Sequence, residues 1–167
     1  MAKVVPYKNA WVALAVTRIA LGFVFLWAFF DKLFGLGFAT KPAAAWVSGG
    51  SPTSGFLKFG VNEHSPLYDF FVGLAGNAWV DWLFMLGLLG IGVALVLGIG
   101  VRLAAFAGTV LLFMMWAAVV PLENNPLIDD HIIYAMVLWV VAFGRRELSL
   151  ASWWLKQPSV KKQPWLW

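Results

Sequence analysis

The sequence contains no cysteine. Disulfide bonds, thiolate nucleophiles, zinc–thiolate sites, iron–sulfur clusters and CxxC redox pairs are therefore excluded from this chain. Histidine is scarce as well, and His64 and His131 stand in unlike surroundings, which makes them poor axial ligands for haem. We predict no metal or haem site, so a redox role requires an electron carrier that another molecule supplies.

Charge is also scarce. Charged residues make up 12% of the 167 positions, hydrophobic residues make up 62%, and the mean hydropathy is +0.81. This composition predicts a membrane protein rather than a soluble domain. The lysines and arginines form no basic stripe on a soluble face, so the net charge of +4 does not indicate nucleic acid. The glycines between residues 87 and 100 follow no strand and form no GxGxxG motif, so they predict close helix packing.

Long apolar runs predict an all-α membrane protein, a four-transmembrane-helix bundle in a single domain over residues 1–167. The expected helices cover about residues 11–30, 80–99, 103–121 and 128–144. One long extracytoplasmic loop, residues 31–78, joins the first two helices, and residues 145–167 form a tail. Within the loop, residues 67–74 suit a short interfacial helix or a simple loop equally well. The first helix also has features of a secretory signal, but we expect it to be retained.

The distribution of lysine and arginine predicts the orientation, because these residues accumulate on the cytoplasmic side. With both termini inside, that side holds Lys3, Lys8, Arg102, Arg145, Arg146, Lys156, Lys161 and Lys162. The outer side holds Asp31, Glu63, Asp69, Asp81, Glu123, Asp129 and Asp130. We therefore expect a multi-pass protein of the cytoplasmic membrane with both termini cytoplasmic and with anionic lipid at its basic side.

The fourth apolar segment carries charge into the membrane. Its apolar part, residues 132–144, covers only about 20 Å, so residues 129–131 must enter the outer leaflet if the segment is to span. Arg18 lies about 15 Å along the first helix, near the midplane. A lone arginine there costs about 3 kcal/mol, so we expect Arg18 to pair with Asp130 from the neighbouring helix.

Two interpretations of this pair stay open: it fixes the helix register, or it faces a ligand. Asp129 and His131 also suit simple contact with water and headgroups, and His64 is expected to be solvated. A polar vestibule is expected at the outer mouth of the bundle. Its members are Asp31, Lys32, Asp81, Glu123, Asn124, Asn125 and residues 129–131.

Three stretches carry a resemblance to a known family. They are RIALGFVFLWAFFDKLFGLGF (residues 18–38), VRLAAFAGTVLLFMMW (residues 101–116) and NNPLIDDHIIYAMVL (residues 124–138). Across all four helices the chain resembles the DoxX/DoxD family of small membrane proteins, and its long outer loop is closer to DoxD, the membrane subunit of thiosulfate:quinone oxidoreductase. The resemblance implies an enzyme that oxidises thiosulfate, or a related small sulfur compound, to tetrathionate at the outer face and reduces a diffusible quinone.

The resemblance also implies a site. Catalytic roles fall to Arg18, Asp130 and His131. Substrate and quinone binding fall to Lys32, Phe25, Phe29, Trp116, Asn125, Asp129 and Tyr134. In this interpretation the aromatic rings form the quinone walls, His131 or Asp130 relays protons, and Lys32 with Arg18 attracts the dianion. The acidic outer side opposes a dianion unless its carboxylates are paired or protonated.

Two other functions stay open. The absence of an obligatory cofactor site and the basic tail favour a non-catalytic membrane anchor or scaffold for soluble redox enzymes. Charge within the membrane favours a small-molecule or proton channel. The expected partners are the lipid bilayer and, as the resemblance implies, a second small subunit, a soluble redox partner or a second copy of the chain.

Overall fold

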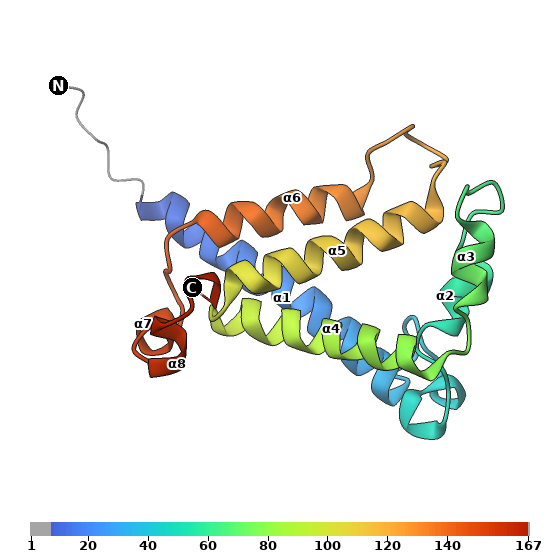
Figure 1. Cartoon of the computed structure of the whole chain (residues 1–167), viewed down its shortest axis with the longest axis horizontal. Coiled ribbons are helices and arrows are strands. Elements are labelled where there is room, and N and C mark those ends of the chain that lie inside the picture. The colour runs from blue at the N-terminus through green and yellow to red at the C-terminus, as the bar shows by residue number, and fades with distance from the viewer. Residues whose placement is uncertain (1–7, 167) are drawn as a thin grey trace.

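The computed structural model describes residues 8–166, and this part of the chain contains helices and no strands. The long helices are α1 (Lys8–Phe34), α4 (Ala78–Leu97), α5 (Val101–Val119) and α6 (Asp130–Phe143) (Figure 1). Between α1 and α4 lie η1 (Pro42–Ala44), η2 (Trp46–Ser48), α2 (Ser54–Phe59) and α3 (Tyr68–Gly73). After α6 come α7 (Ala151–Trp154), α8 (Pro158–Lys161) and η3 (Pro164–Leu166). The predicted all-α class is confirmed for the described residues.

Helices α1, α4 and α5 are each long and apolar enough to cross a membrane. Helix α6 is apolar as well, but its 14 residues rise only about 21 Å. The structure thus supports a membrane protein with three candidate spans, and the fourth span stays a prediction. Gly35 and Gly98, at φ +67° and +69°, stand at the ends of α1 and α4, where a left-handed residue stops a helix most easily.

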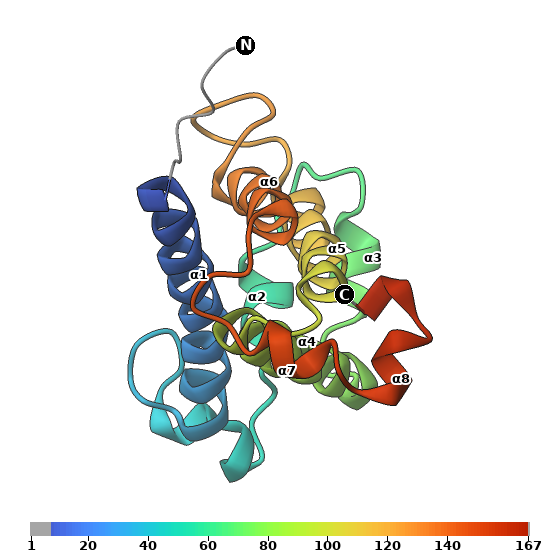
Figure 2. The same ribbon diagram turned by 90° about the vertical axis from the view of Figure 1, so that its left-hand side faces the viewer.

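The long helices pack in the spatial order α1, α4, α5, α6. Contact is extensive between α1 and α4 and between α5 and α6, and it is slight between α1 and α6. The start of α1, the α4–α5 turn and residues 144–166 lie at one end of the bundle, which we call the tail end (Figures 1 and 2). Residues 35–77 and 120–129 lie at the opposite, loop end. Both ends of the described chain therefore share one end of the bundle.

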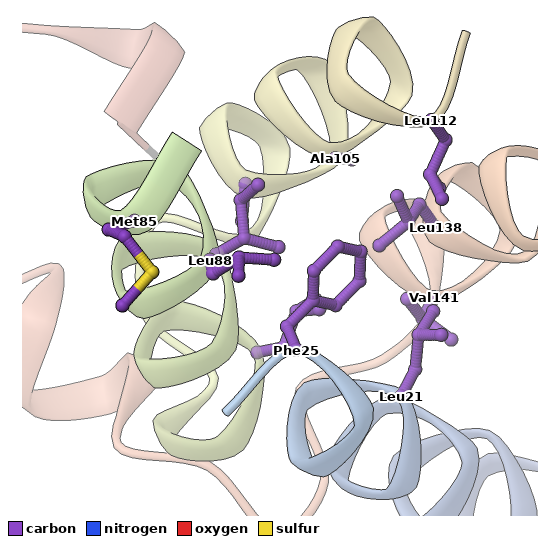
Figure 3. Packing of buried hydrophobic residues seen from close by; sticks show 11 residues of the cluster. Leu21, Phe25, Met85, Leu88, Ala105, Leu112, Leu138 and Val141 are labelled. Carbon is purple, nitrogen blue, oxygen red and sulfur yellow. The ribbon is translucent and has the colours of Figure 1, made fainter. Parts of the chain in front are cut away.

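Apolar side chains fill the middle of the bundle. Leu21 and Phe25 of α1 belong to the same buried cluster as Leu88 of α4, Ala105 of α5 and Leu138 of α6 (Figure 3). Within a bilayer such helix contacts are stabilised by close van der Waals packing, because lipid tails are as apolar as the side chains themselves. This packed interior offers no support for the channel interpretation.

Glycines allow the helices to approach closely. A Cβ atom built on Gly92 of α4 would lie 2.7 Å from Leu26 Cγ of α1. On Gly108 of α5, the same atom would lie 2.6 Å from Leu138 Cδ1 of α6. Both distances are shorter than real carbon contacts, so an added Cβ would force a shift of Leu26 at Gly92, backbone included, and of the movable end of the Leu138 side chain at Gly108. The predicted packing role of the α4 glycines is confirmed for Gly92, whereas Gly90 meets open space.

Large apolar side chains also cover the outside of the long helices. Phe23 of α1, Leu83 of α4, Phe106 of α5 and Met136 of α6 are each between 59% and 67% exposed. An apolar surface of this extent is unfavourable in water and favourable in hydrocarbon. The outer surface of all four helices therefore suits contact with lipid.

Residues 35–77 form a folded cap on α5, not a plain loop. Phe71 of α3 packs in an apolar cluster with Ala118 near the end of α5. The Asn62 amide donates to the Ala118 carbonyl at 3.0 Å, and the Ser65 hydroxyl donates to the Ala117 carbonyl at 3.1 Å. These bonds satisfy carbonyl groups that the last turn of a helix leaves unpaired. Of the two interpretations of residues 67–74, the short helix is the one present, as α3.

Candidate functional site

Arg18 is buried in the tail end of the bundle, with 5% of its surface exposed. Its Nη1 donates to the Leu95 carbonyl of α4 at 2.9 Å. Its Nη2 donates to the carbonyls of Glu147 and Leu148 in the tail, at 3.2 and 2.8 Å. One guanidinium thus joins α1, the end of α4 and the segment that follows α6.

The predicted Arg18–Asp130 pair is wrong. Within residues 8–166, the ion pairs are those of His131 with Asp129 and Asp130, and Arg18 takes part in neither. The reason is the direction of the side chains, since the Cα–Cβ bond of a helical residue tilts toward the helix N-terminus. Arg18 therefore extends toward the tail end, where α1 begins, and Asp130 extends toward the loop end, where α6 begins.

Asp129 and His131 form a hydrogen-bonded pair at the loop end. Asp129 is the N-cap of α6, and its Oδ1 accepts from the Ile132 amide at 3.2 Å. Its Oδ2 lies 2.7 Å from His131 Nδ1. Partial burial opposes the carboxylate charge, but the hydrogen bonds from His131 and Ile132 outweigh it and hold the pKa of Asp129 below its ordinary value. When Nδ1 carries a proton, the carboxylate accepts a hydrogen bond from it, and this contact orients the imidazole ring.

Asp130 stands beside this pair but points mainly to the outside. Its side chain is 69% exposed, and its Oδ1 lies 3.5 Å from His131 Nδ1. The coordinating atoms of Asp129, Asp130 and His131 lie within 4.8 Å of one another, so this triplet is the group in the described chain that comes nearest to a metal site. Tyr134 lies one turn further along α6 and is 37% exposed.

The loop before α6 is held in place by two other predicted site residues. Asn125 Oδ1 accepts from the amides of Leu127 and Ile128, both at 2.9 Å, which shapes a turn. The indole of Trp116 donates to the Leu127 carbonyl at 2.9 Å and stacks on Phe113 with a ring separation of 5.2 Å. Asn125 and Trp116 thus place the residues that lead directly into Asp129.

A groove of about 790 Å³, lined by both polar and apolar residues, lies between this loop and the cap. The residues that line it are Phe59, Gly60, Val61, Asn62, His64, Val119, Leu122, Glu123, Asn124, Asn125, Ile128 and Asp129. The lining includes two carboxylates and no lysine or arginine. The groove therefore attracts cations or neutral polar molecules more readily than anions.

The predicted single vestibule is wrong for Asp31 and Asp81, which are buried and engaged in the cap. Asp31 accepts from the amides of Phe38 and Ala39 at 3.2 and 3.0 Å. Asp81 Oδ1 accepts from the Ser51 hydroxyl at 2.9 Å and from the Thr53 hydroxyl at 2.6 Å. Each carboxylate ties a turn of the cap to the end of a long helix, and neither lines the groove.

The remaining predicted site residues lie apart from the Asp129–His131 pair. Phe25 is buried in the middle of the bundle with 4% exposure, and Phe29 packs against the same cluster, so they do not wall a slot with Trp116. The Lys32 ammonium lies over the ring of Phe84 at 5.8 Å, beside α4. The structure therefore leaves Asp129, His131 and the groove beside them as the candidate site.

Two contributors to the groove are not evident from the sequence. His64 is exposed, as expected for a solvated residue, but it also lines the groove. Asn62 lines the groove as well, and its side-chain amide donates to the Pro121 carbonyl at 2.7 Å and joins the cap to the loop before α6. Local spacing gives no sign of this contact, because it joins residues 59 positions apart.

Comparison of the chain with protein-family models, with curated proteins and with solved structures gave no match. The resemblance to the DoxX/DoxD family therefore stays a prediction. The proposed function rests on the geometry of the Asp129–His131 pair and the neighbouring groove.

Proposed function

We propose that this chain is a membrane-embedded, quinone-linked oxidoreductase subunit that oxidises thiosulfate or a related small sulfur compound at its loop end. The observation that carries the proposal is the 2.7 Å hydrogen bond between Asp129 and His131 at the start of an apolar helix. A quinone dissolved in the bilayer needs a proton donor at the membrane surface, and a histidine oriented by a carboxylate is a suitable one. The family resemblance supports the choice of reaction.

Two thiosulfate ions lose two electrons as the central S–S bond of tetrathionate forms, and the quinone takes up these electrons with two protons to become a quinol. In this proposal His131 delivers the two protons one at a time from Nε2 and regains each from water at the loop end, while Asp129 stabilises the imidazolium through Nδ1. The exposed ring of Phe113, stacked on Trp116, offers an apolar surface for the quinone near the same loop.

The sharpest test uses two electron acceptors. The purified protein is mixed with thiosulfate and either a soluble quinone or ferricyanide, which accepts electrons without protons. His131→Gln is expected to lower the quinone rate by about 10²-fold or more and to affect the ferricyanide rate much less. The matched control is Asp69→Asn on the exposed surface of α3. Absence of turnover with both acceptors, or equal loss with both, would refute the proposal.

The charge of the groove tests the substrate class. Glu123 lines the groove and repels an anion, so Glu123→Gln is expected to lower KM for thiosulfate about two- to fivefold at low ionic strength. Steady-state kinetics at two salt concentrations measure the effect. An unchanged or higher KM for thiosulfate would contradict binding of this anion in the groove beside Glu123.

A non-catalytic membrane anchor for soluble redox enzymes is the second candidate. It is favoured because the buried polar residues Arg18, Asp31 and Asp81 all serve internal hydrogen bonds. Affinity purification from native membranes would then recover a soluble redox enzyme in a fixed ratio to the chain. Recovery of the chain without any stoichiometric partner would count against this function.

The proposed location is the cytoplasmic membrane with the tail end inside. The cationic side chains gathered at the tail end support this, because lysine and arginine accumulate on the cytoplasmic side. In that orientation the Asp129–His131 pair and the groove face outward. Labelling of single cysteines introduced at residues 69 and 161 with a membrane-impermeant reagent tests the orientation in whole cells.

A further inference from the structure

A cavity of about 30 Å³ lies at the tail end, where α1, the α4–α5 turn, the end of α6 and the tail meet (Figure 2 views this end). Arg18, Arg145 and Arg146 line it together with Ser149 and Trp154. Arg18 is buried in its wall, whereas Arg145 and Arg146 are exposed. Three arginines from two distant parts of the sequence thus line one small space, and the Arg145 guanidinium also lies over the ring of Trp11, at 5.3 Å from its centroid.

No carboxylate of the described chain neutralises these charges. Within residues 8–166 no lysine or arginine forms an ion pair, and the partners of Arg18 are backbone carbonyls. Carbonyl dipoles satisfy hydrogen bonds but do not supply a countercharge, and a buried charge without a countercharge is costly. The Arg145 and Arg146 amides also donate no hydrogen bond to another described residue. The cavity therefore presents donors and positive charge without an anion.

We propose that this cavity binds a phosphate group, carried by an anionic phospholipid of the leaflet at the tail end. A volume of about 30 Å³ admits one phosphate oxygen, since a water needs roughly 10–15 Å³ by the same measure. The other oxygens remain at the mouth, within the region of Arg145 and Arg146. Guanidinium groups bind phosphate in a bidentate manner and are the preferred side chains for such a site.

The tail places this cavity at the level of lipid headgroups. Trp153 and Trp165 are 55% and 56% exposed, and tryptophan side chains concentrate at membrane–water interfaces. Lys156, between α7 and α8, is exposed as well. Exposed rings near an exposed ammonium group are typical of a segment that lies on an anionic lipid surface.

The test compares two variants with the same change in charge. Arg145→Gln with Arg146→Gln removes two cations from the cavity, and Lys161→Gln with Lys162→Gln removes two from the tail outside its lining. The full chain, in nanodiscs of phosphatidylcholine, is titrated with phosphatidylglycerol or with inorganic phosphate, and binding is measured by native mass spectrometry. Circular dichroism confirms that both variants remain helical.

The cavity variant is expected to lose about tenfold or more in affinity, and the lysine variant is expected to change much less. Binding of phosphatidylglycerol alone identifies a lipid headgroup as the ligand, and competition by inorganic phosphate shows that free phosphate occupies the same cavity. Equal losses of affinity in the two variants would show that the general positive charge of the tail end, and not the cavity, binds the lipid, and would overturn the proposal. Wild-type protein that binds neither probe would overturn it as well.

Discussion

Gly98 allows Arg18 to reach the end of α4. It has φ +69°, and a Cβ atom built on it would lie 2.0 Å from Arg18 Nη1 and 2.3 Å from Ser149 Cβ. Gly98→Ala is therefore expected to cause two separate losses. The left-handed backbone costs a residue with Cβ about 1–2 kcal/mol, and displacement of the guanidinium from the Leu95 carbonyl costs about 1.5–3 kcal/mol. Together these lower the free energy of unfolding by roughly 2.5–5 kcal/mol.

Gly100 supplies the matched control, because it lies two residues further on in the same turn. Its φ is +56°, and an added Cβ would meet nothing within 4 Å. Gly100→Ala therefore carries the backbone cost of about 1–2 kcal/mol without the clash. The effect of Gly→Ala on the unfolded chain is the same in both variants and cancels in the comparison. The difference between the variants, roughly 1.5–3 kcal/mol, measures the contacts that an added Cβ disturbs at Gly98, which are those with Arg18 and Ser149.

Thermal unfolding in detergent, followed by circular dichroism, measures this difference. For a chain of this size, 1 kcal/mol corresponds to about 2–4 °C in Tm, so Gly98→Ala is expected to unfold roughly 3–12 °C below Gly100→Ala. Limited proteolysis supplies a second readout, because release of Arg18 frees the Glu147 and Leu148 carbonyls and loosens the tail. Equal Tm values for the two variants, with equal protection of the tail, would refute the structural role given to Arg18.

Two further predictions concern helix packing and the cap. Gly92→Ala brings its Cβ within 2.7 Å of Leu26 Cγ and should destabilise the α1–α4 contact by about 1–3 kcal/mol. Gly90→Ala meets open space and should be neutral or stabilising by up to about 1 kcal/mol. Chemical denaturation of both variants measures the difference. Asp81→Ala leaves the Thr53 hydroxyl and amide without their acceptor, so it should lower the free energy of unfolding by about 3 kcal/mol and make residues 35–77 cleavable by protease. Asp69→Ala on the exposed face of α3 is the control and should stay within about 0.5 kcal/mol of wild type.

The helices could be predicted from the sequence because each is a long apolar run that ends at a recognisable signal. Gly35 and Gly98 take left-handed conformations at the ends of α1 and α4, and Asp129 is the N-cap of α6. The fold of residues 35–77 could not be predicted in the same way. It depends on Asp81 accepting from Thr53 and on Asn62 reaching Pro121, and contacts over such separations leave no periodic pattern.

The candidate site was predicted only in part, for a reason of geometry. Depth along a helix can be counted from the sequence at about 1.5 Å per residue, and this count placed Arg18 and Asp130 within reach of each other. The count ignores that side chains lean toward the N-terminus of their own helix. Because α1 and α6 begin at opposite ends of the bundle, the two side chains diverge. The sequence already contained this information, because two long helices lie between α1 and α6, and an even number of intervening helices makes the first and the last antiparallel.

The same geometry separates two kinds of charge in this protein. Arg18, Asp31 and Asp81 are buried, and each is held by backbone or hydroxyl groups that join one segment to another. Asp129 and His131 are also hydrogen-bonded, but Asp129 in addition lines the neighbouring groove. A charged residue in a membrane helix is usually a functional candidate, because its transfer into lipid costs free energy. In this chain the hydrogen-bond partners of Arg18, Asp31 and Asp81 account for that cost within the fold, so these three residues are not functional candidates on this ground alone.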